Sequence, residues 1–115
     1  MSEHAQQVAL FAWAAYAQAE YPELELLFAI PNGGHRHKAT AGRLRAEGVK
    51  RGVPDVCLPI PRGNYAGLWI EMKYGRNKPT ADQERWIEAL RAAGHRVEVC
   101  YEWTEARDVI EEYLR

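Results

Sequence analysis

The chain has 115 residues, of which 47% are hydrophobic and 27% are charged, and its formal net charge at pH 7 is −1. This length suits one hydrophobic core, so we expect residues 1–115 to form a single domain. No apolar run approaches the ~20 residues of a transmembrane helix, and the N-terminus lacks the basic start of a signal peptide. The composition therefore argues against a membrane protein and against a secreted one.

Two cysteines, Cys57 and Cys100, fall within predicted strands, where free buried thiols are usual. Two cysteines do not make a disulfide framework, and no residues have the spacing of zinc ligands. We therefore expect free thiols and a reducing, cytoplasmic location.

The apolar periodicity predicts helices and strands in alternation along the chain. Ser2 is a candidate N-cap for the first helix, and the nearly continuous apolar run at 24–30 predicts a strand buried on both faces. A short turn joins two apolar runs into a hairpin, and the last strand follows a helix, which favours parallel pairing. The expected helices cover 2–19, 35–47, 80–93 and 102–114, and the expected strands cover 24–30, 56–60, 68–72 and 95–101. This order predicts an α/β fold with a mixed four-stranded sheet flanked by helices.

The predicted hairpin carries three charged residues at one end. If its turn centres near residues 62–64, Asp55 lies opposite Glu71 or Lys73, and directly opposed residues have Cβ atoms roughly 4.5–5.5 Å apart. Since side chains alternate faces along a strand, Trp69, Glu71 and Lys73 share one face. The hairpin thus predicts two carboxylates and an ammonium close together.

A divalent cation is a natural occupant of such a group. Two close carboxylates repel, whereas Mg²⁺ favours one or two carboxylates together with waters and phosphate oxygens. Lys73 would then hold the attacking water or neutralise charge that develops on a phosphate. The alternative is that Asp55 is an ordinary turn residue and that Glu71 and Lys73 form a solvated ion pair.

Basic residues gather in the middle of the chain. Residues 31–79 contain ten Lys and Arg against three acidic residues, a local charge of +7 in a chain of −1. A local basic face, rather than the net charge, decides affinity for a polyanion. Asn32 and Gly33 stand in a glycine-rich loop that suits phosphate contact, although a plain turn is equally compatible.

Glu3 and Gln83 each have two explanations. Glu3 complements the dipole of the first helix or reaches toward the carboxylates. Gln83 completes a capping box with Thr80, or it faces the carboxylates and orients water or phosphate there. The sequence pattern leaves both choices open.

Several motifs together resemble the VRR-NUC (virus-type replication-repair nuclease) family of the PD-(D/E)xK superfamily. They are Glu3 in the opening helix, Pro31-Asn32-Gly33-Gly34 before a basic helix, Gly52-Val53-Pro54-Asp55, Ile70-Glu71-Met72-Lys73, and Gln83 three residues before Trp86. The resemblance covers nearly the whole chain. It implies a restriction-endonuclease-like αβββαβ core with a basic helix inserted after the first strand and a further helix at the C-terminus.

The resemblance also implies an activity: a metal-dependent nuclease of bacterial or phage origin. Asp55, Glu71 and the Met72 carbonyl would bind Mg²⁺ or Mn²⁺, Lys73 would position the attacking water, Glu3 would complete the acidic cluster and Gln83 would support it. DNA contacts are expected from Asn32, Gly33, Arg36, Lys38, Arg43, Lys50, Arg51, Arg76 and Lys78. The resemblance to small members of the family also implies a homodimer that cuts branched DNA such as Holliday junctions, since two cuts need two sites. The alternatives are a DNA-binding module that does not cut and a metabolic enzyme acting on a small phosphate ester.

Overall fold

The fold is seen in a computed structural model that describes residues 1–31 and 38–115. The predicted contacts from Asn32, Gly33 and Arg36 therefore lie outside the described residues, and of Lys38 only the backbone is described.

A mixed sheet of four strands forms the centre of the molecule, in the order β1-β2-β3-β4. Pairing is antiparallel between β1 and β2 and between β2 and β3, and parallel between β3 and β4. The strands are β1 (Phe28–Ala29), β2 (Val56–Leu58), β3 (Leu68–Met72) and β4 (Arg96–Cys100). The predicted α/β fold with a mixed four-stranded sheet is confirmed.

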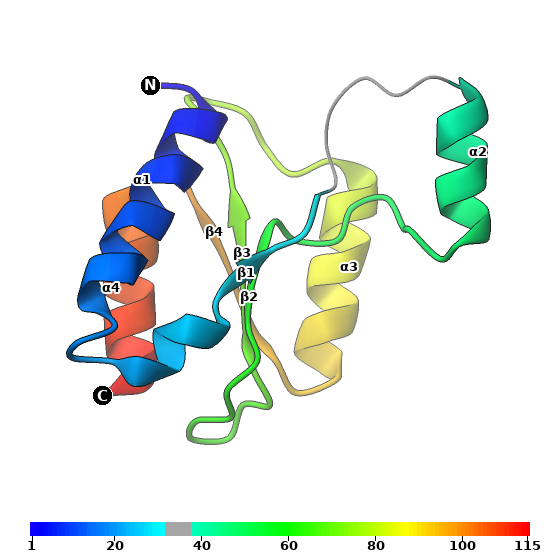
Figure 1. Cartoon of the computed structure of the whole chain (residues 1–115). Helices are drawn as coiled ribbons and strands as arrows, with labels where there is room; N and C mark the ends of the chain where they lie inside the picture. The colour runs from blue at the N-terminus through cyan, green and yellow to red at the C-terminus, as the bar shows by residue number, and fades with distance from the viewer. Residues whose placement is uncertain (32–37) are drawn as a thin grey trace.

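Helices cover both faces of the sheet (Figure 1). They are α1 (Glu3–Ala17), α2 (Lys38–Ala46), α3 (Ala81–Ala92) and α4 (Trp103–Leu114), with a short 3-10 helix, η1 (Pro22–Leu26), between α1 and β1. Helices α1 and α4 lie on one face of the sheet and α3 on the other, while α2, the inserted basic helix, stands away from the sheet beyond α3. The chain order contains the expected αβββαβ core.

The first predicted strand is mostly wrong. Residues 24–30 were expected to form a strand buried on both faces, but Pro22 begins the 3-10 helix η1, and β1 consists of two exposed residues at the sheet edge. Proline fixes the backbone torsion φ that suits the first turn of a helix. Leu24 and Leu27 reach the core, whereas Leu26 is 51% exposed. The apolar run at 24–30 predicted burial, but only some of its side chains are buried.

The side chains of β3 alternate between two hydrophobic clusters. Leu68, Ile70 and Met72 pack in the larger cluster, which includes α1 and α4. Trp69 packs in a smaller cluster with Ile87 and Leu90 of α3. Since Glu71 and Lys73 follow Trp69 with a period of two, they belong to the face that α3 covers.

Both cysteines are free and buried, as expected. Burial raises the pKa of Cys57 to about 11 and that of Cys100 to about 12, so both remain unreactive thiols near neutral pH.

None of the helices in the described part of the chain has the length and apolar character of a membrane span.

Candidate active site

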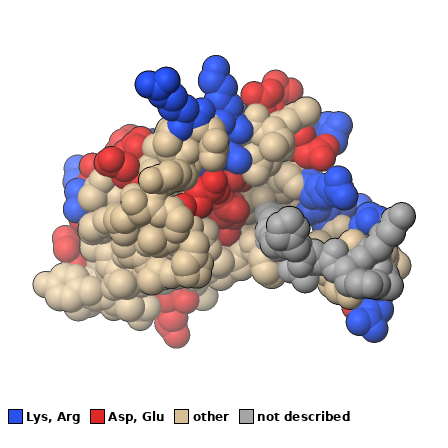
Figure 2. Space-filling view, turned by 90° about the horizontal axis from the view of Figure 1, so that it is seen from above, with Lys and Arg blue, Asp and Glu red and all other residues tan. Residues whose placement is uncertain are grey.

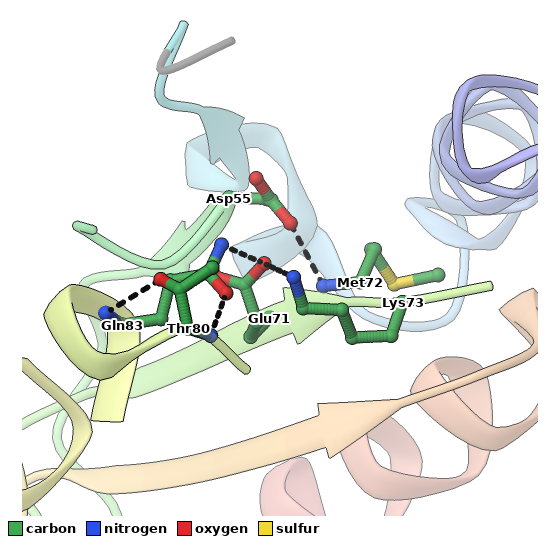
Figure 3. A network of polar contacts seen from close by, with 6 residues as sticks. All are labelled: Asp55, Glu71, Met72, Lys73, Thr80 and Gln83. Atoms are coloured by element: carbon green, nitrogen blue, oxygen red, sulfur yellow. Dashed lines mark hydrogen bonds and ion pairs between the residues drawn. The ribbon is translucent and has the colours of Figure 1, made fainter. Parts of the chain in front are cut away.

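The β2–β3 register brings Asp55 and Glu71 together. Val56 pairs with Ile70, so one step further along the hairpin places Asp55 opposite Glu71, one of the two predicted arrangements. Asp55 is fixed on both sides, because its carbonyl accepts from the Ile30 N–H at 2.8 Å and its Oδ2 accepts from the Met72 N–H at 2.8 Å. Its carboxylate is therefore held at the end of β3 (Figure 3).

Glu71 is a buried carboxylate whose hydrogen-bonding capacity is only half used. Its residue is 1% exposed. Oε2 accepts from Gln83 Nε2 at 3.2 Å and lies 3.9 Å from Lys73 Nζ, whereas the buried Oε1 has no hydrogen-bond partner among the residues that the structure describes. A buried oxygen without a partner is costly, so this atom requires a proton or a cation.

The surroundings of Glu71 oppose its ionisation in the metal-free protein. The pKa of Glu71 is raised to about 9, first by burial and then by the Asp55 carboxyl through a hydrogen bond and charge repulsion. Lys73 lowers this pKa and Glu3 raises it further, both through charge. A divalent cation between the two carboxylates would reverse the balance, because it favours the ionised form of both.

Lys73 stands beside this carboxyl pair with little access to water. The residue is 7% exposed. Its backbone N–H donates to the Cys100 carbonyl at 2.9 Å, so the residue that follows β3 is held against the end of β4. A lysine in this setting differs from the solvated ion pair that was the alternative interpretation. Figure 3 shows the Lys73 amine directed toward Glu71.

Gln83 caps α3 and also faces the carboxylates, as two of its predicted contacts require, and its role in orienting water or phosphate stays a prediction. Its Oε1 accepts from the Thr80 N–H at 2.9 Å, and its own N–H donates to Thr80 Oγ1 at 3.2 Å, which completes the capping box of α3. The remaining group, Nε2, donates to Glu71. The N-terminus of α3 and the buried carboxylate are thus joined through one side chain.

The donor set fits a hard divalent cation such as Mg²⁺ or Mn²⁺. Asp55 and Glu71 supply carboxylate oxygens, and the orphaned Oε1 of Glu71 is a ready ligand. Since the N–H and carbonyl of one strand residue point toward the same neighbour, the Met72 carbonyl faces the Asp55 side as its N–H does. In residues 1–31 and 38–115 no group of three or more His, Cys, Asp and Glu side chains is arranged to hold a metal, so waters or phosphate would complete the shell.

Glu3 lies in the first turn of α1 and is partly buried. It acts on the site through its charge, which raises the pKa of Glu71. Its predicted place in the acidic cluster stays a prediction.

Five of the predicted DNA contacts have exposed side chains in the described residues. Figure 2, which looks down on the end of the sheet where β3 ends, shows acidic side chains in a hollow with Lys and Arg on the rim beside it. Arg51 also lines a cavity of 280 Å³ together with Gly52, Thr80 and Gln83. The five residues are Arg43, Lys50, Arg51, Arg76 and Lys78.

The sequence interpretation missed one structural element of the site, the close contact between Gly52 and the first turn of α3. A Cβ atom on Gly52 would lie 2.6 Å from the Asp82 carbonyl group. The glycine within the Gly52–Asp55 motif was visible in the sequence, but the helix that it touches is thirty residues away along the chain.

Comparison with known proteins agrees with this geometry. The sequence profile of the VRR-NUC domain matches residues 3–103. A solved structure described as a VRR_NUC domain protein is similar to this chain with a TM-score of 0.85 and 27% sequence identity, over 99% of this chain and 88% of the other. No curated protein is significantly similar in sequence. The profile match spans the α1 residue Glu3, the carboxyl pair and Gln83, and it shows that the chain belongs to the VRR-NUC family of nuclease-type domains.

Proposed function

We propose that the protein is a Mg²⁺- or Mn²⁺-dependent DNA endonuclease that hydrolyses phosphodiester bonds. The observation that carries the proposal is the Asp55–Glu71 carboxyl pair, in which the buried Oε1 of Glu71 accepts no N–H or O–H from the described residues. A buried carboxylate whose ionisation is opposed by burial and by a neighbouring carboxyl is costly as a structural feature, and a divalent cation would favour its ionised form.

The roles of the residues follow from their positions. Asp55, Glu71 and the Met72 carbonyl would hold the cation, which supplies Lewis-acid activation of the phosphate and of a bound water. The Lys73 amine, 3.9 Å from Glu71, orients the attacking water and balances charge on the phosphate. Gln83 keeps the Glu71 carboxylate in one orientation by donating to Oε2.

Cleavage of labelled DNA tests this proposal. The wild-type protein is expected to cut DNA with Mg²⁺ or Mn²⁺ and to be inactive with chelator, and Asp55→Ala and Lys73→Ala variants should lose cutting while their circular dichroism stays native. Asp108→Ala, an exposed residue of α4, serves as the matched control that retains activity. DNA binding without cutting by the wild type, with both metals tested, would instead support a binding module that does not cleave.

The proposal extends to branched DNA and a homodimer. Two strands of a junction need two sites, which a two-fold dimer supplies. A panel of Holliday junction, flap, nicked and linear duplex substrates under one metal condition tests the preference. Faster cutting of the junction than of linear duplex supports it, and equal rates contradict it.

Helix α1 offers a surface for the second copy. Residues 5–19 contain no charged side chain, yet Val8 is 56% and Tyr16 84% exposed. His4, Val8, Ala12 and Tyr16 recur every four residues along α1 and are all exposed, so they form one ridge. If two such ridges pair in opposite directions with the small Ala12 at the two-fold axis, Val8 meets Tyr16.

Sedimentation velocity checks the pairing. We expect the wild type to sediment as a dimer and Tyr16→Glu as a folded monomer, since a buried unpaired charge opposes association. Val49→Glu, which places the same charge on another exposed apolar residue, should remain dimeric. A monomeric wild type, or a dimeric Tyr16→Glu variant, would reject the α1 surface.

A further inference from the structure

Gly52 makes a close backbone contact that a Cβ atom would obstruct. Its backbone torsion φ is +90°, a conformation that residues other than glycine rarely adopt. A Cβ built on Gly52 would lie 2.6 Å from the carbonyl carbon and oxygen of Asp82 and 2.9 Å from the backbone nitrogen of Gln83. The atoms that it would meet are backbone atoms of a helix, which cannot turn aside as a flexible side chain can.

This contact joins the loop that leads to Asp55 with the helix that carries Gln83, and both of these side chains interact with Glu71. Asp55 follows Gly52 by three residues, through the buried Pro54, and Gln83 stands in the first turn of α3. The loop backbone therefore sets how close the Asp55 segment comes to Gln83. Glu71 accepts its hydrogen bond from the side chain of that same Gln83.

The distances indicate that the arrangement tolerates little displacement. To restore an ordinary contact of 3.4 Å, the loop and the helix would have to separate by about 0.8 Å. The Gln83 Nε2 to Glu71 Oε2 distance is already 3.2 Å, at the long end of the range for N–H···O bonds. A displacement of that size would break this bond and leave both oxygens of Glu71 without a donor from Gln83.

We infer that Gly52 is a positioning residue, whose missing side chain lets the Asp55 loop dock on the first turn of α3 and so holds Gln83 against Glu71. The inference deepens the proposed nuclease function, and its test by DNA cleavage rests on that function. Its test by hydrogen exchange does not depend on cleavage.

Gly48 provides a matched control. It lies in the same loop region with φ of +97°, but a Cβ there would have no heavy atom of the described residues within 4 Å. Gly48→Ala and Gly52→Ala thus impose similar backbone strain, and only Gly52→Ala imposes the clash. Any difference between the two variants reports the contact with α3.

The structural test uses hydrogen exchange of the metal-free protein, measured by NMR. The Gln83 backbone N–H, which donates to Thr80 Oγ1, should exchange about tenfold faster in Gly52→Ala than in the wild type and be nearly unchanged in Gly48→Ala. The side-chain amide resonances of Gln83 should shift in Gly52→Ala alone. Equal behaviour of the two variants would overturn the inference.

The activity test asks whether Gly52 acts through Gln83. Gly52→Ala should lower cleavage about tenfold to hundredfold, the usual effect of losing a residue that orients a metal ligand. In a Gln83→Ala background the same change should have almost no further effect, because the bond that it breaks is already gone. Full additivity would overturn the inference, whereas a wild type that cuts no DNA would reject the nuclease function and leave the exchange test standing.

A measurement on the wild type guards against a variant that fails to fold. Nuclear Overhauser contacts between the Gly52 Hα protons and the Gln83 amide proton should be strong. Their absence would overturn the inference. So would an unfolded Gly52→Ala beside a folded Gly48→Ala, because that outcome assigns Gly52 to folding rather than to positioning.

Discussion

Gln83 donates a hydrogen bond from Nε2 to Oε2 of Glu71 at 3.2 Å while its Oε1 caps helix α3 at the Thr80 N–H. The start of α3 and the buried carboxylate are therefore held by the two ends of one amide. A glutamine suits this position because it offers an acceptor and a donor on one rigid group.

Replacing Gln83 separates its structural and functional contributions. Gln83→Ala should cost about 1 kcal/mol of unfolding free energy through the lost cap and reduce cleavage about tenfold or more. Thr80→Ala removes the reciprocal cap bond at similar cost but leaves the Gln83 bond to Glu71, so it should keep most activity. Urea unfolding and single-turnover cleavage measure the two effects, and equal activity of both variants would contradict the assignment.

Glu71 should make the metal-free protein less stable as pH rises. Its pKa is raised from 4.5 to about 9, first by burial and then by Asp55, so the unfolded chain releases this proton near pH 4.5 and the native chain keeps it to about pH 9. The unfolded state therefore binds fewer protons across this window, and native stability falls as pH increases through it.

The variant Glu71→Gln tests this titration. It cannot ionise, so in chelator near pH 8 its Tm should exceed that of the wild type by about 5 °C, and the difference should vanish toward pH 4.5. Glu88→Gln, an exposed change on α3, is the control and should follow the wild type. A Tm difference that is the same at pH 4.5 and pH 8 would rule out the titration.

Cation binding should release a proton. Because Glu71 keeps its proton at neutral pH and a metal ligand must be deprotonated, binding of Mn²⁺ at pH 7.5 should displace about one proton. Calorimetry in two buffers of different ionisation enthalpy measures this release. The same heat in both buffers would show that the binding site does not include a protonated Glu71.

The exposed basic residues should contribute charge without sequence specificity. Each alanine variant of a basic residue that contacts a phosphate should reduce by about 1 the steepness with which the logarithm of the DNA-binding constant falls with log salt concentration. The variants are Arg43→Ala, Lys50→Ala, Arg51→Ala, Arg76→Ala and Lys78→Ala. Arg115→Ala is the control, since the C-terminus lies at the opposite end of the sheet from the end of β3 (Figure 1). A variant whose slope equals that of the control does not contact the backbone of the DNA.

The parts of the site that depend on local rules were predictable from the sequence. The period of two and the short turn place Asp55 opposite Glu71 or Lys73, of which the structure has the first, and the Thr80–Gln83 spacing predicts the capping box that the structure contains. The parts that depend on tertiary packing were not predictable in this way. An apolar run predicts burial, but it cannot show that β1 lies at a sheet edge, and the Gly52 contact exists only after α3 has docked.

The central claim is that Asp55 and Glu71 share one divalent cation, and anomalous diffraction from crystals soaked with Mn²⁺ tests it most directly. The claim predicts a manganese peak within coordinating distance of Asp55, the Oε1 atom of Glu71 and the Met72 carbonyl, and no such peak in Asp55→Asn crystals. A manganese peak elsewhere on the protein, with the Glu71 oxygen still without a ligand, would contradict it.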